Sequence, residues 1–187
     1  MQSTLLDTPP LPDELVAVWH DVLGSWKSGL RKKAIGSAET LVARLSQGEP
    51  DQEARFGRWL CERLFDDSFG WKGQWGGNAG YEHAPDYALS IFPLATGVVI
   101  PHLGRELQKP TGQALRWLYQ ATVGMGGRIT PEARDRLDEM LRGVCGQGAG
   151  RLELLRLAAA DDERAQRWLA DIESDDHPCG PLWIPRD

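Results

Sequence analysis

The sequence is poor in cysteine, which limits the covalent and metal chemistry available to the fold. Its three cysteines, Cys61, Cys145 and Cys179, lie far apart and form no C-x-x-C pair. Neither a disulfide-stapled scaffold nor a zinc cluster has this spacing. We therefore expect three reduced thiols, as in a cytoplasmic protein, and no cofactor.

Long apolar runs are also missing. The first residues, MQSTLLDTPPLPDE, lack the basic region and the apolar stretch of a secretory signal peptide. The most apolar segment, residues 91–101 (IFPLATGVVIP), contains two prolines and is far shorter than the ~20 residues of a membrane-spanning helix. The sequence therefore predicts a soluble, cytoplasmic protein with no membrane contact.

Positive charge is scarce: 21 basic residues face 27 acidic ones, which gives a net charge of −6. Because nucleic-acid binding needs a basic face that displaces counterions, we expect no nucleic-acid partner. The acidity concentrates near the C-terminus, where residues 161–187 hold eight acidic and three basic side chains. This region is either a solvated face that keeps the protein soluble or a surface that meets a basic partner.

The signatures of common enzymes are absent as well. The chain has no H-E-x-x-H, G-x-S-x-G or S-x-x-K motif and no G-x-x-x-x-G-K-[ST] phosphate loop. Residues 123–130 (VGMGGRIT) could hold an anion before a helix, but they follow a helix rather than a strand, which favours a plain interhelical turn. Cys179 lies near His177, yet the prolines around it favour an apolar tail over a nucleophile with rigid support.

Apolar residues recur at helical spacing through most of the chain. Breaks at Ser28-Gly29 and at Gly48 separate three helices, with Gly48 expected in the left-handed conformation of a helix cap. A fourth helix is expected from Pro85, broken near Pro93 and Pro101, because a strand over ATGVVI would have no partner strand. The remaining helices are predicted over residues 111–121, from an N-cap at Thr130, and over residues 151–159 and 161–173. The stripes of the first three helices are Leu15, Trp19, Val22 and Trp26; Leu30, Ala34, Ala38, Leu41 and Leu45; and Phe56, Trp59, Leu60, Leu64 and Phe65.

These segments predict an all-α fold, an irregular bundle of about eight short helices packed as antiparallel hairpins, without significant sheet. A solenoid is the alternative, but the tetratricopeptide pattern is absent and the segments share no similarity. We expect a single helical domain over residues 1–187. It includes a proline-rich lead (1–11), a Gly/aromatic loop (68–84) and a proline-rich tail (174–187).

One stretch, residues 71–87 (WKGQWGGNAGYEHAPDY), stands apart from the helices. Its glycines let the backbone approach a partner closely, and tryptophan and tyrosine dominate binding hot spots. The alternative is that the rings only pin the loop over the helix ends; we expect Trp71 to pin the loop and Trp75 to face solvent. The predicted binding residues are Trp71, Trp75, Tyr81, His83 and Tyr87.

The predicted function is a protein-binding module of the immunity, inhibitor, adaptor or regulatory type, which uses this loop and the acidic C-terminal region. The alternative is an enzyme or metal protein, because carboxylates and a histidine at the two ends of the loop could converge on a divalent metal or act as an acid/base pair. Those candidates are Asp66, Asp67, Glu82, His83 and Asp86. Their spacing matches no known ligand template, which favours the binding module.

Overall fold

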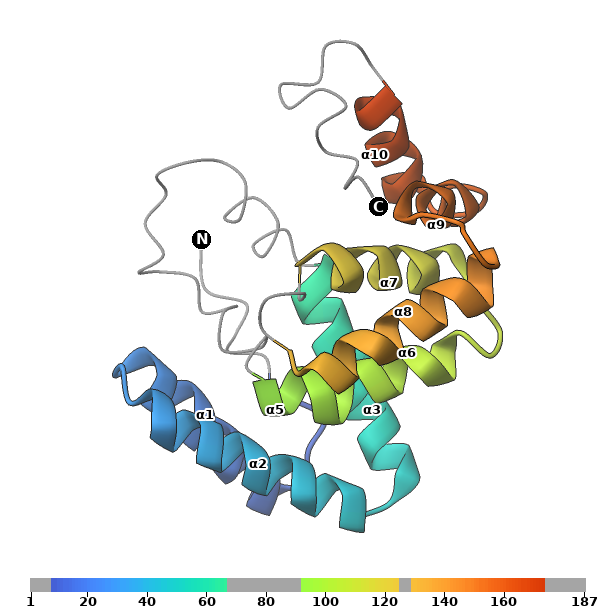
Figure 1. Cartoon of the computed structure of the whole chain (residues 1–187). Helices are drawn as coiled ribbons and strands as arrows, with labels where there is room; N and C mark the ends of the chain where they lie inside the picture. Colours follow the sequence, from blue (N-terminus) through green and yellow to red (C-terminus); the bar gives the residue numbers. More distant parts are fainter. Residues whose placement is uncertain (1–7, 67–91, 125–128, 174–187) are drawn as a thin grey trace. The chain divides into compact units, whose positions relative to one another are not determined.

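The computed structural model of the chain describes residues 8–66, 92–124 and 129–173. Every regular element in these ranges is helical and none is a strand, so the predicted all-α fold is confirmed (Figure 1). The chain divides into two compact units, one up to His102 and one from Leu103 onward, and the single domain stays a prediction. Among the described residues, no helix has the length and apolar character needed to cross a bilayer.

The first unit begins with a helical hairpin of α1 (Asp13–Lys27) and α2 (Arg31–Gln47), which Figure 1 shows side by side. The chain turns at Gly29, whose φ of +73° is a left-handed conformation that glycine adopts readily. Leu30, predicted in the buried stripe, instead lies in the turn before α2 and is 54% exposed. Trp26, also predicted in a stripe, is only half-buried. The other predicted stripe residues are buried, namely Leu15, Trp19, Val22, Ala34, Ala38, Leu41 and Leu45, and Leu23 is buried as well.

The third helix, α3 (Pro50–Cys61), starts with proline in its first turn and continues as a wider π-helical turn, η2 (Glu62–Asp66). Its apolar stripe meets α1 through aromatic rings. Trp19 contacts Phe56 and Trp59 edge-on with ring centroids 5.7 Å apart, and Phe56 stacks on Trp59 at 5.8 Å. Both arrangements suit the charge distribution of aromatic rings. Of the predicted stripe, Phe56, Leu60 and Phe65 are buried, whereas Trp59 and Leu64 are half-buried.

Gly48 ends α2 as predicted, but not in the predicted conformation. Its φ of −87° and ψ of −163° are extended rather than left-handed. The physical reason is the short connection to α3, because Pro50 forces the residue before it, Glu49, into the extended region as well. The chain therefore leaves one helix and enters the next without the room that a capping turn needs.

Residues 92–106 form a helical run where the sequence predicts a break. Helix α5 (Phe92–Leu94) passes into the π-helical turn η5 (Ala95–Val99) and then into α6 (Ile100–Glu106). Pro101 donates no N–H, and in a regular α-helix its ring would clash with the carbonyl four residues earlier. The wider turn before Pro101 accommodates the ring, so the break becomes a change of helical pitch.

Two glycines bring the helices of the first unit close together. A Cβ atom on Gly97 would collide with the side chain of Val42 in α2. A Cβ atom on Gly57 in α3 would lie 2.9 Å from Cβ of His102, closer than real Cβ atoms come. Therefore the backbone of η5 at Gly97 packs directly on the side chain of Val42 in α2. Likewise, the side chain of His102 in α6 packs directly on the backbone of α3 at Gly57.

The second unit contains α7 (Gly112–Gly124), α8 (Pro131–Cys145), α9 (Arg151–Ala158) and α10 (Glu163–Glu173). The hydroxyl of Thr130 accepts a hydrogen bond from the N–H of Ala133 at 3.2 Å, which confirms the predicted cap of α8. Thr111 caps α7 in the same way through the N–H of Ala114. Such caps satisfy helix N–H groups that have no partner within the helix.

Helix α7 is buried on all sides, since every residue from Ala114 to Thr122 is buried. Polar groups in such a helix require internal partners. Nε of Arg116 lies 2.9 Å from both carboxylate oxygens of Asp162, and its Nη1 donates to Oε1 of Gln120 at 3.3 Å. The guanidinium also lies over the ring of Trp168, 5.7 Å from its centroid. These contacts join α7 to α10.

Asp162 serves both helices, because its Oδ1 also accepts the N–H of Ala165 at 2.8 Å and so caps α10. The start of α7 lies equally close to the turn between α9 and α10. A Cβ atom on Gly112 would lie 2.6 Å from the carbonyl oxygen of Ala158 and would also collide with Asp161. Glycine is therefore required where the chain enters α7.

Candidate functional site

Most of the side chains that the sequence nominates for function lie outside the described residues. This applies to the whole predicted binding loop, so the loop stays a prediction. It also applies to four of the five candidate ligands of the enzyme or metal alternative. The residues concerned are Trp71, Trp75, Tyr81, His83 and Tyr87 for binding, and Asp67, Glu82, His83 and Asp86 as ligands.

Asp66 is the one described member of the ligand set, and it ends the π-helical turn η2, half-buried. Within the described ranges, no three histidine, cysteine or acidic side chains come together as a metal site. Cys61 is buried and Cys145 is half-buried, and neither forms a disulfide within the described residues. Burial raises the pKa of the Cys145 thiol, and the negative charge of Glu153 raises it further, so this thiol is a poor nucleophile at neutral pH.

The described part of the chain does contain a surface hollow, and it lies over α8. Helix α8 turns one side inward, where Ala133 and Leu137 are buried. The remaining apolar residues predicted to face inward, Met140, Leu141 and Val144, are only half-buried. The opposite side of α8 is exposed, and the hollow lies along it.

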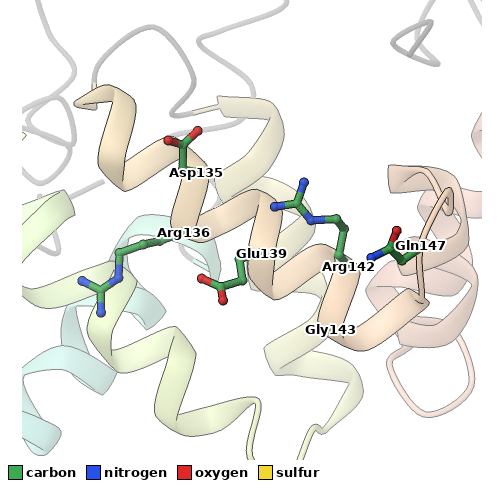
Figure 2. A pocket seen from close by; sticks show the side chains of 6 residues that line it. All are labelled: Asp135, Arg136, Glu139, Arg142, Gly143 and Gln147. Atoms are coloured by element: carbon green, nitrogen blue, oxygen red, sulfur yellow. The ribbon is translucent and has the colours of Figure 1, made fainter.

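The hollow has a volume of about 610 Å³ and is widely open to solvent. Figure 2 shows that its lining comes from successive turns of α8 and from the loop after it, with the side chain of Gln147 directed back toward Arg142. We call this surface the α8 face. It consists of Asp135, Arg136, Glu139, Arg142, Gly143 and Gln147.

The charges on the α8 face are not used by the fold. Asp135, Arg136, Glu139 and Arg142 form no ion pair with any residue in the described ranges. Asp135 and Glu139 are four residues apart, a spacing at which two like charges destabilise a helix. The α8 face therefore presents two carboxylates and two guanidinium groups that remain available to another molecule.

Gly143 adds a second departure from what a stable helix prefers. It lies inside α8, where glycine is less stable than alanine by roughly 0.5–1 kcal/mol. A Cβ atom there would meet nothing within 4 Å, so no contact of the described residues requires glycine. The effect of Gly143 is to leave the backbone of α8 uncovered at one end of the hollow.

Sequence reasoning did not find this face, because charged residues opposite an apolar stripe are typical of any solvated helix. The one feature of the sequence that could have indicated this face is the pair of like charges at Asp135 and Glu139 together with Gly143 near the end of the helix. Comparison of the chain with protein-family models, curated proteins and solved structures finds no match.

Proposed function

We propose that the chain is a protein-binding module and that the α8 face contacts its partner. The observation that carries the proposal is Gly143, a helix-destabilising residue that the packing of α8 does not require, placed among unpaired charges of both signs. A glycine on an exposed helix allows the backbone of another chain to approach closely. The flanking carboxylates and guanidinium groups would then set orientation and register through ion pairs.

The shape and lining of the hollow support a protein partner over a small ligand. Small-molecule sites are mostly apolar and enclose most of the ligand's surface. The α8 face is widely open to solvent, so it would leave much of a small ligand's surface exposed. Arginine, which supplies two of its six lining residues, is enriched in protein interfaces and binding hot spots. A cytoplasmic adaptor, inhibitor or immunity protein fits this proposal.

The test is affinity capture from native lysate with the full chain, compared between charge-swapped variants. Glu139→Lys with Arg142→Glu exchanges two of the four charges of the α8 face and leaves the net charge unchanged. Arg58→Glu with Glu62→Arg is the matched control, because it swaps the charges of an exposed i,i+4 ion pair between α3 and η2 and keeps the net charge. We expect a protein that wild type and control retain and the α8 variant loses.

Gly143→Gln provides a second measurement, in which folding and binding should move in opposite directions. The helix should become more stable by roughly 0.5–1 kcal/mol, because glutamine has the higher helix propensity. Capture of the same partner should weaken, because the side chain covers the exposed backbone. Identical capture by wild type, Gly143→Gln and the α8 charge swap would refute the proposal.

A further inference from the structure

The turn between α1 and α2 carries an unusual combination of exposed side chains. Leu30 is 54% exposed, the highest value among the exposed large hydrophobic side chains of the described residues. Trp26, near the end of α1, is half-buried, and the guanidinium of Arg31 lies 6.0 Å from its ring centroid. Lys27 and Lys32 are also exposed. We call these five residues the hairpin tip.

The hairpin tip is a concentrated positive patch on a chain whose net charge is −6. Lys33, just beyond it, pairs with Asp21 at 2.7 Å. Lys27, Arg31 and Lys32 form no ion pair with any residue that the structure describes. Three cations that lie within three positions of one exposed leucine are therefore not neutralised by an ion pair with a described residue.

The local stability of α2 does not explain this arrangement. Leu30 occupies the N-cap, where leucine is among the poorest residues, and it makes no capping hydrogen bond. The first turn of α2 contains no acidic residue but has Arg31, Lys32 and Lys33. Cations at a helix N-terminus oppose the helix dipole. Positions where a sequence departs from several local preferences at once are the expected places for function.

We infer that the hairpin tip binds the surface of an anionic lipid bilayer. An exposed leucine surrounded by cations suits the boundary between acyl chains and headgroups, where the apolar side chain enters and lysine and arginine contact the phosphates. Each cation close to an anionic surface strengthens binding by about fivefold. Two other ligands fit the hairpin tip less well. A polyanion without an apolar part would bind the cations but would not contact Leu30 favourably. An acidic protein would need a cavity that matches the shape of the turn.

The hairpin tip would contact one face of a bilayer, and such contact requires no membrane-spanning segment. The sequence predicts no membrane contact only because it lacks a long apolar run and a signal peptide, and neither is needed for surface binding. The acidic residues of the chain oppose it only over short distances, because charge interactions are screened beyond about 8 Å at physiological ionic strength. It is independent of the α8 face.

The experiment is co-sedimentation of the full chain with phosphatidylcholine vesicles that contain or lack phosphatidylserine. We expect binding only to the anionic vesicles, weakening as salt is added. Lys32→Glu should lower partition roughly 25-fold, because it changes two charges at the tip. Lys109→Glu changes the net charge equally at an exposed site outside the tip and should leave partition within about twofold of wild type.

Leu30→Ser separates binding from folding, because serine is a good N-cap and should raise the melting temperature while it lowers partition about tenfold. No sedimentation with anionic vesicles at low salt would overturn the inference. Equal effects of Lys32→Glu and Lys109→Glu would also overturn it, since only net charge would then matter. If Leu30→Ser left partition unchanged and heparin competed fully, the tip would be a general polyanion site and the lipid assignment would be wrong.

Discussion

The ion pair between Arg116 and Asp162 allows a quantitative test of how the second unit is held together. The two side chains are 3% and 10% exposed, so water screens their interaction little. Breaking a buried pair by removing one partner typically destabilises a protein by roughly 3–5 kcal/mol. Asp162→Asn keeps an oxygen that can cap α10 but removes the charge that faces Arg116. We expect a loss of about 3 kcal/mol, near the lower limit because Gln120 still contacts the guanidinium.

Asp162→Ala removes the cap of α10 as well as the charge, and loss of a cap costs about 1 kcal/mol more. Arg116→Met combined with Asp162→Asn should be less destabilised than Asp162→Asn alone. The reason is that no charge then remains buried, and an apolar residue of similar length replaces arginine. The measurement is equilibrium unfolding in urea of the four proteins, extrapolated to water.

The order of the variants decides whether this reasoning holds. A loss of less than about 1 kcal/mol for Asp162→Asn would mean that the pair behaves like an exposed salt bridge. A double variant less stable than the single one would mean that the pair is favourable overall and not merely hard to break. The first result would contradict the account of α7 as a helix whose buried polar groups depend on partners at α10. The second would contradict the expectation that the pair is hard to break without being favourable overall.

Two further predictions concern the packing of α7 and the α1–α2 hairpin. Gly112→Ala should destabilise the protein by roughly 1–3 kcal/mol, because its Cβ atom would lie 2.6 Å from the carbonyl oxygen of Ala158. Gly36→Ala should stabilise the protein by about 0.5–1 kcal/mol, because its Cβ atom would meet nothing within 4 Å. If urea unfolding gave the two variants stability changes of the same sign, the close approach at Gly112 would be contradicted. Hydrogen bonds from Lys33 and Ser37 lower the pKa of Asp21 below its ordinary 3.8, so its contribution to stability is complete above pH 3.8 and is lost as the pH falls through the folded-state pKa. The stability difference between wild type and Asp21→Asn should therefore vanish in strong acid, and a constant difference at all pH values would refute this.

Much of the fold is predictable because it depends on local periodicity and capping. The stripes that contain Trp19 and Phe56 have helical spacing, and the cap at Thr130 needs only a threonine before a proline and an apolar run. Leu30 was misassigned because spacing alone does not reveal where a turn takes the backbone out of register. The conformation at Gly48 was misassigned because Pro50 restricts the link that follows it.

The rest of the arrangement depends on contacts between distant residues. Arg116 and Asp162 are 46 positions apart, and nothing in a single sequence pairs one charge with another at that separation. Burial of α7 on all sides is equally hidden, because Arg116 and Gln120 give the segment a polar appearance. The α8 face requires knowledge of which charges remain unpaired after folding, and only the packed structure supplies it.

The contact between Gly97 and Val42 has a consequence for how these two positions can evolve. Because the backbone of η5 rests on the valine side chain, a methyl group gained at position 97 requires volume lost at position 42. Two substitutions that are each harmful alone would be tolerated together, so their fitness effects depend on order and background. In sequences that share this fold, alanine at position 97 should therefore accompany alanine or glycine at position 42, and the two positions should change as a correlated pair.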